Sequence, residues 1–160
     1  MCKIFSTILL TLTLISCATS TAVNYEQEKS DYKNAAVNLV STINSISFSK
    51  KAVMKQSLNA VEMAKPLIKR YAKKYPKCTI LTDFILMKEK EILNSKPEQL
   101  ESDYHEGNIL PEFDSDCHDI KEVVVHPATV YSLAKYKNLS DSKEQMLDEM
   151  EEVLMHLDSL

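Results

Sequence analysis

The chain has 160 residues, a formal net charge of −4 and a single glycine. Its mild acidity argues against a nucleic-acid-binding protein, because affinity for phosphate backbones depends on clustered lysine and arginine side chains. A single glycine also excludes the glycine-rich loops of P-loop and dinucleotide-binding proteins, and it argues against a sheet with tight hairpins.

Residues 1–16 have the pattern of a secretory signal peptide. One lysine, Lys3, precedes a largely apolar run from Ile4 to Ile15, and small residues follow it. The run is too short to cross a bilayer, which takes about 20 apolar residues in a helix. We therefore expect residues 1–16 to be removed, and the loss of Lys3 would make the remaining chain one charge more acidic.

The leader ends in Leu14-Ile15-Ser16-Cys17, which resembles the lipobox of bacterial lipoproteins, where a small residue precedes an invariant cysteine. The resemblance implies cleavage after Ser16 and lipid attachment at Cys17. Three acyl chains hold a protein on a membrane far more firmly than a single chain does. Ordinary signal-peptidase cleavage after Ala22 is the alternative, and the resemblance covers the leader only.

A lipid at Cys17 would make the membrane a partner of the protein and leave the folded part in water. In bacterial lipoproteins, an aspartate directly after the lipid-bearing cysteine resembles a signal for retention in the inner membrane, and this chain has Ala18 there. The resemblance therefore favours the outer membrane of the bacterial cell envelope, with the domain facing the periplasm. Residues 17–24 are then expected to form a tether. Residues 25–160 are expected to form one domain, long enough to bury a core.

Beyond the tether, apolar residues recur at intervals of three and four, which is typical of amphipathic helices. The sequence therefore predicts an all-α fold, a single helical bundle of about four main helices with shorter helices and a loop rich in His and Asp. The main helices are expected at roughly 25–47, 50–74 and 80–93, and from an N-cap at Ser140 or Asp141 to Leu157.

Proline positions suggest how these helices are divided. Pro66 is expected to kink the second helix or break it in two. Pro97 and Pro127 are each expected in or near the first turn of a short helix, where a proline is tolerated. Residues 122–125, Glu-Val-Val-Val, favour a short buried extended segment, because β-branched residues prefer an extended backbone.

Two of the four cysteines are left to pair with each other. Cys2 would leave with the leader and Cys17 would carry lipid, so Cys78 and Cys117 are expected to form a disulfide in an oxidising compartment. Closing a loop of this length stabilises a fold by roughly 4 kcal/mol in the chain-entropy treatment. The alternative is that Cys117 stays a free thiolate and acts as a ligand beside His118.

A stretch from Ser102 to Val130 concentrates side chains that bind metals. We consider His105, Glu106, Asp116, His118 and His126 as candidate metal ligands, with Asp114 and Asp119 nearby. Imidazole and carboxylate groups suit Zn²⁺, Cu²⁺ or Ni²⁺. No HExxH motif or paired CxxC supports the assignment.

The same stretch also fits a well-capped acidic loop without a metal. Gly107 would supply the left-handed residue that ends a helix, and His105 would meet the last carbonyls of that helix. Aspartates are common in loops and caps, and His126 could cap a helix starting at Pro127. The spacing does not decide between the two interpretations.

Haem and enzyme chemistry receive little support. Cys117-His118 lacks the first cysteine of the c-type haem motif Cys-x-x-Cys-His. A non-covalent haem could use His156 on the last helix with Met54 or Met63 opposite, although methionines at helical spacing usually fill cores. No serine lies in a nucleophile elbow, and no catalytic residue is proposed.

These observations predict a lipid-anchored binding or interaction module, whose envelope partner or small ligand the sequence does not name. The alternative is a transition-metal- or haem-binding periplasmic protein that uses the region from His105 to His126. Nucleic acid is not an expected partner. No cofactor is expected for the interaction module, and the alternative favours a transition metal over haem.

Overall fold

The computed structural model describes residues 20–160. The expected signal peptide and lipid attachment at Cys17 fall in residues 1–19 and lie outside the described residues. The first helix, α1, spans Ser20–Asn44 and so begins within the stretch 17–24 that was expected as a tether. Among residues 20–160, no helix combines the length and apolar character needed to cross a membrane.

The regular secondary structure of residues 20–160 is entirely helical and contains no strands, which confirms the predicted all-α bundle. Five helices are long. They are α1, α2 (Lys50–Lys74), α3 (Thr79–Ile92), α5 (His118–Tyr136) and α6 (Lys143–Ser159). The short elements between them are η2 (Pro76–Cys78), α4 (Pro97–Gln99), the π-helical turn η3 (Leu100–His105) and η4 (Ser115–Cys117).

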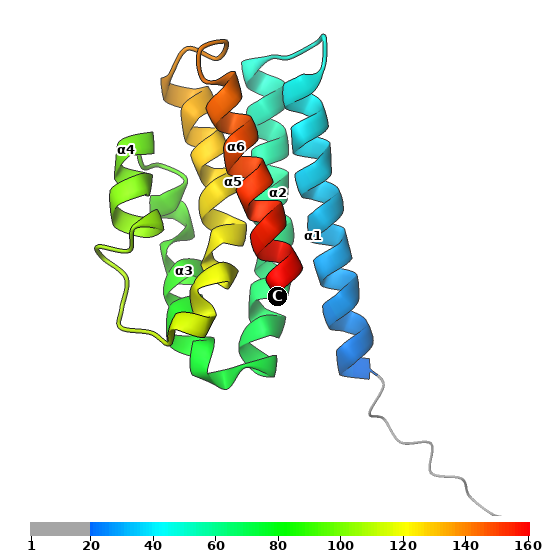
Figure 1. The fold of residues 1–160 in the computed structure, drawn as a ribbon, viewed down its shortest axis with the longest axis vertical. Helices are drawn as coiled ribbons and strands as arrows, with labels where there is room; N and C mark the ends of the chain where they lie inside the picture. Colours follow the sequence, from blue (N-terminus) through cyan, green and yellow to red (C-terminus); the bar gives the residue numbers. More distant parts are fainter. Residues whose placement is uncertain (1–19) are drawn as a thin grey trace, which may run out of the picture.

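Four of the long helices, α1, α2, α5 and α6, form the bundle (Figure 1). In it α1 packs on α2 and α6, and α5 packs on the same two neighbours, so each helix buries its apolar stripe against two others. The stripes meet in one core that includes Leu39, Ile43, Leu67, Val123 and Leu157. Outside this ring, α3 lies against α5 and α2, and the short α4 contacts α5 and η3 (Figure 1).

The sequence-based prediction was wrong for α5, which is one of the four bundle helices. Residues 122–125 are not extended and Pro127 does not start a helix, because α5 runs without interruption from His118 to Tyr136. All three valines of that stretch are buried. Their burial in the core outweighs their preference for extended backbone. The predicted role of His126 as a helix cap is therefore also wrong.

Other helix boundaries follow the predictions more closely. The bounds of α2 agree with the predicted 50–74, and Ser49 accepts a hydrogen bond from the Ala52 N–H at its start. Pro66 does not break this helix in two. Pro97 does occupy the first turn of a short helix. The N-cap of α6 is Ser142, one residue beyond the predicted Asp141.

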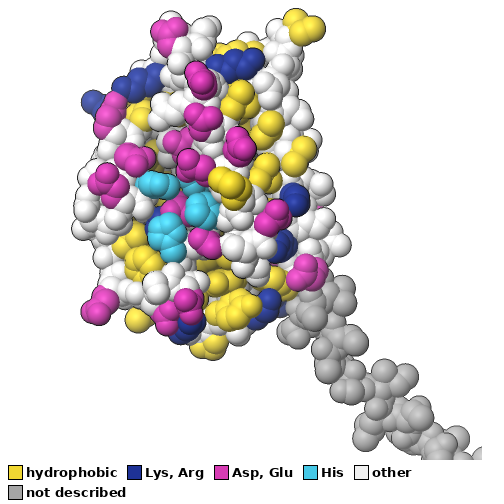
Figure 2. Space-filling model, viewed as in Figure 1, with side chains coloured by type: hydrophobic (Ala, Val, Ile, Leu, Met, Phe, Trp, Pro, Cys, Tyr) yellow, Lys and Arg dark blue, Asp and Glu magenta, His cyan; other side chains and the backbone are white. Residues whose placement is uncertain are grey.

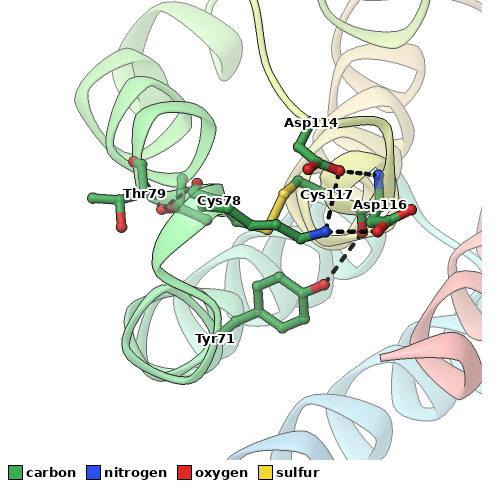
Figure 3. The surroundings of a disulfide bond; sticks show 8 residues. Tyr71, Cys78, Thr79, Asp114, Asp116 and Cys117 are labelled. Carbon is green, nitrogen blue, oxygen red and sulfur yellow. Dashed lines mark hydrogen bonds and ion pairs between the residues drawn. A yellow bond between two sulfur atoms is a disulfide. The ribbon is translucent and has the colours of Figure 1, made fainter.

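The disulfide between Cys78 and Cys117 is present and joins the start of α3 to the start of α5 (Figure 3). Cys117 is thus not a free thiolate, and the alternative of a sulfur ligand is wrong. Beside the bond, the Lys77 ammonium donates hydrogen bonds to Asp114 and Asp116. The covalent link and these ion pairs hold the first turn of α5 against the rest of the fold.

Gly107 ends the segment that carries His105. Its φ of +87° lies in the left-handed region that glycine adopts without strain. The helix end predicted at Gly107, with glycine as its left-handed residue, is therefore confirmed. His105 is the last residue of η3, and η3 packs against α5.

Candidate metal centre

All four histidines of the chain come together on one face of the molecule, with acidic side chains around them (Figure 2). His105 comes from the end of η3, His118 and His126 from α5, and His156 from α6. The ring centroids of His105 and His126 are 5.2 Å apart, those of His126 and His156 5.6 Å, and those of His118 and His156 6.0 Å. His126 is almost fully buried, whereas the other three are partly exposed and open the cluster to solvent.

The continuity of α5 explains this arrangement. His118, Glu122 and His126 follow one another at intervals of four residues, which places their side chains on one face of a helix, each one turn from the next. α6 packs along the same side of α5 and brings His156 and Glu149 to it. Two helices and the end of η3 therefore supply the whole cluster.

A buried carboxylate, Glu122, lies at the middle of the cluster. Its Oε2 is 3.4 Å from His105 Nδ1 and 3.7 Å from His126 Nε2, and its side chain is 0 % exposed. These separations are longer than ordinary hydrogen bonds, which measure about 2.7–3.2 Å. A tetrahedral metal with ligand bonds of about 2.1 Å places neighbouring ligand atoms about 3.4 Å apart. The spacing therefore fits ligands around an ion better than it fits hydrogen bonds.

Three buried side-chain polar atoms in residues 25–160 have no hydrogen-bond partner, and two of them are the candidate ligand atoms Glu122 Oε2 and His126 Nε2. The third is the Tyr32 hydroxyl on α1. Burial, and after it the negative charge of Glu122, raises the pKa of Tyr32. An unsatisfied buried polar group costs about 1–3 kcal/mol. A cation between Glu122 and His126 would satisfy both atoms.

A second carboxylate orients the buried histidine. His126 Nδ1 lies 2.8 Å from Glu149 Oε2. Since a carboxylate only accepts hydrogen bonds, Nδ1 carries a proton, and the other ring nitrogen, Nε2, faces Glu122. This carboxylate–histidine arrangement is the usual support of a metal-binding imidazole.

Within residues 25–160, Lys121 is the only buried lysine or arginine that contacts a residue of the histidine cluster. Its side chain is 1 % exposed, its ammonium is paired with Glu122 Oε1, and it donates a hydrogen bond to the His105 carbonyl. Burial alone would raise the pKa of Glu122, but His105 and Lys121 together lower it to about 2. Glu122 is thus a carboxylate at neutral pH, with one oxygen held by Lys121 and the other facing the histidines.

The structure brings together three of the candidate ligands predicted from sequence, His105, His118 and His126. It does not bring Glu106 or Asp116 to them. Asp116 pairs with Lys77 at 2.6 Å, and Glu106 accepts a hydrogen bond from Asn108. His156, which the sequence suggested only as a haem ligand, lies in the histidine cluster and bonds Asp119 through Nδ1 at 2.8 Å.

Glu122 was the main omission of the sequence reasoning. The signal was present in the spacing 118, 122 and 126, but it becomes visible only when these residues are taken as one helix. Treating residues 122–125 as extended removed Glu122 from consideration.

Comparison with known proteins identifies no relative for this chain. No family model matches it, and neither a curated protein nor a solved structure does. The functional argument therefore depends on the geometry of the centre.

Proposed function

We propose that the protein binds a transition-metal ion through His105, Glu122 and His126. The observation that carries the proposal is the convergence of three ligand atoms, all within 4.8 Å of one another. Two of these atoms, Glu122 Oε2 and His126 Nε2, are buried and have no hydrogen-bond partner. Two imidazoles and one carboxylate form a ligand set known for zinc and for non-haem iron. Three protein ligands leave one coordination position open to water or to a small ligand.

The ligand chemistry favours some ions over others. Mg²⁺ and Ca²⁺ prefer sites made of oxygen atoms, whereas imidazole nitrogen suits Zn²⁺, Cu²⁺ and Ni²⁺. Glu152 adds a further carboxylate at the rim, with Oε2 3.8 Å from His126 Nε2. Net negative charge around the histidines favours capture of a dication.

The proposal is tested by calorimetric titration of Zn²⁺ into tag-free protein that has been stripped with a chelator. We expect tight binding that His105→Ala and Glu122→Gln each weaken by more than the roughly 10–100-fold that loss of an outer-shell partner costs. His105 is the safer variant, because its side chain is partly exposed and its truncation leaves no buried cavity. Circular dichroism checks that both variants remain folded.

Asp116→Asn and Glu106→Gln serve as matched controls. Both carboxylates belong to the same acidic stretch but point to other partners, so both variants should bind zinc as tightly as the wild type. Zinc binding that depends on Asp116 and not on His105 would contradict the proposal, as would the absence of binding.

We also propose that the domain is anchored to the bacterial cell envelope by lipid at Cys17 and faces the periplasm. The lipobox-like sequence supports this, and a disulfide between Cys78 and Cys117 is consistent with an oxidising compartment. Mass spectrometry of the protein from its native membrane should find an N-terminal acylated Cys17. A mature chain that begins at Met1, or at Val23 without lipid, would contradict the anchor.

A further inference from the structure

We infer that the centre holds two metal ions, the second bound by His118, Asp119 and His156. This inference rests on the proposed function, because it adds a second ion to the same histidine cluster. The ligand atoms of the second group also lie within 4.8 Å of one another, and each of the three side chains is partly exposed, so an ion can reach them from solvent.

Asp119 supplies the oxygen around which the second group is built. Its Oδ1 lies 2.8 Å from His156 Nδ1 and 3.6 Å from His118 Nδ1. The other oxygen, Oδ2, accepts a hydrogen bond from the Ser159 hydroxyl, which fixes the orientation of the carboxylate. An ion bound here would take the place of the proton that Asp119 and His156 share.

Glu122 connects the two groups through opposite oxygens. Oε2 faces His105 and His126 of the first group, whereas Oε1 lies 3.5 Å from His118 Nε2. When His118 binds an ion through Nδ1, its Nε2–H is directed at Oε1. Glu122 would thus be a ligand of the first ion and an orienting partner for a ligand of the second. Stacking of the His126 and His156 rings, 17° from parallel, places a ligand of one ion against a ligand of the other.

The net charge of the centre is negative, which favours the binding of dications. The clustered histidines lie within 4 Å of four carboxylates, those of Asp119, Glu122, Glu149 and Glu152. Lys121 contributes one opposing positive charge, located on the Oε1 side of Glu122. Because that side faces His118, we expect the second ion to bind more weakly than the first.

The number of ions and their separation are measured with Cu²⁺ as the probe. Stripped, tag-free protein is loaded with Cu²⁺, and metal analysis is combined with electron paramagnetic resonance. We expect two ions per chain, with a spectrum broadened by magnetic interaction between them. The double variant His118→Ala, His156→Ala should retain one ion with an unbroadened spectrum, and Glu122→Gln should weaken both sites.

The outcomes separate this inference from the proposed function. No bound ion in the wild type would overturn both. One ion that His105→Ala removes would support the proposed function and overturn the second site. Two ions without magnetic interaction, or two ions in the His118→Ala, His156→Ala variant, would overturn the paired centre. Asp116→Asn is the control and should retain two interacting ions.

Discussion

Lys121→Met is expected to destabilise the metal-free protein by about 3 kcal/mol, because breaking a buried ion pair leaves the remaining charge without compensation. Lys121 and Glu122 are both fully buried, and His105 together with Lys121 keeps the pKa of the Glu122 carboxylate low, so that it stays ionised. We expect zinc to restore most of the lost stability, since the ion would replace the ammonium as the partner of Glu122. The free energy of unfolding is measured by chemical denaturation with chelator and with saturating Zn²⁺.

The same variant is expected to bind zinc more tightly than the wild type. An ammonium group a few ångströms from a dication opposes binding, and its removal should strengthen binding by about tenfold or more, even with the dielectric constant of water. Lys135→Met is the matched control, because Lys135 lies on the same helix but its side chain contacts Asn94, away from the centre. A Lys121→Met protein that is as stable as the wild type without metal, or that binds zinc more weakly, would contradict this role.

Loss of the disulfide is the second large effect that we expect. Cys78 and Cys117 are 39 residues apart, and closing such a loop stabilises a fold by about 4 kcal/mol in the chain-entropy treatment. The Cys78→Ser, Cys117→Ser variant should therefore unfold at a much lower denaturant concentration. It should also bind the second ion less well, because Cys117 directly precedes His118 at the first turn of α5.

Reduction provides an independent check on the disulfide. Dithiothreitol should destabilise the wild type by about the same amount as the double substitution and should have no effect on the variant. Equal stability of oxidised and reduced wild type would rule out a stabilising role for the cross-link. Loss of the first, His105-dependent metal site in the Cys78→Ser, Cys117→Ser variant would contradict the proposed separation of the two sites.

The amphipathic helices could be predicted from sequence, and the buried helix could not. Residues 50–74 carry polar side chains on one face and apolar side chains on the other, so helical periodicity was clear and the predicted bounds agree with α2. By contrast, 14 of the 19 residues of α5 are buried. A helix buried on nearly all sides lacks the periodic alternation of apolar and polar residues from which a helix is predicted.

Local preferences made the prediction of α5 harder. Three consecutive valines favour extended backbone, and Pro127 suggests a helix start. Packing of α5 against α2, α3 and α6 outweighs both signals. The resulting error affected the site directly, because Glu122 belongs to the centre only when it shares a helical face with His118 and His126.

The candidate site was predicted by residue type more successfully than by position. Three of the five predicted metal ligands lie in the centre, and all three are histidines. Glu106 and Asp116 were included only because they are close in sequence, and the structure directs Asp116 to Lys77 instead. His156 is distant in sequence and reaches the centre through the pairing of α5 with α6.

Anomalous X-ray diffraction from zinc-loaded crystals tests the metal centre most directly, because it locates the ion itself. We predict a strong zinc peak about 2.1 Å from His105 Nδ1, Glu122 Oε2 and His126 Nε2, with a weaker peak at His118, Asp119 and His156. Zinc found only at Asp114 and Asp116, or no peak beside the four imidazole rings at saturating zinc, would contradict it.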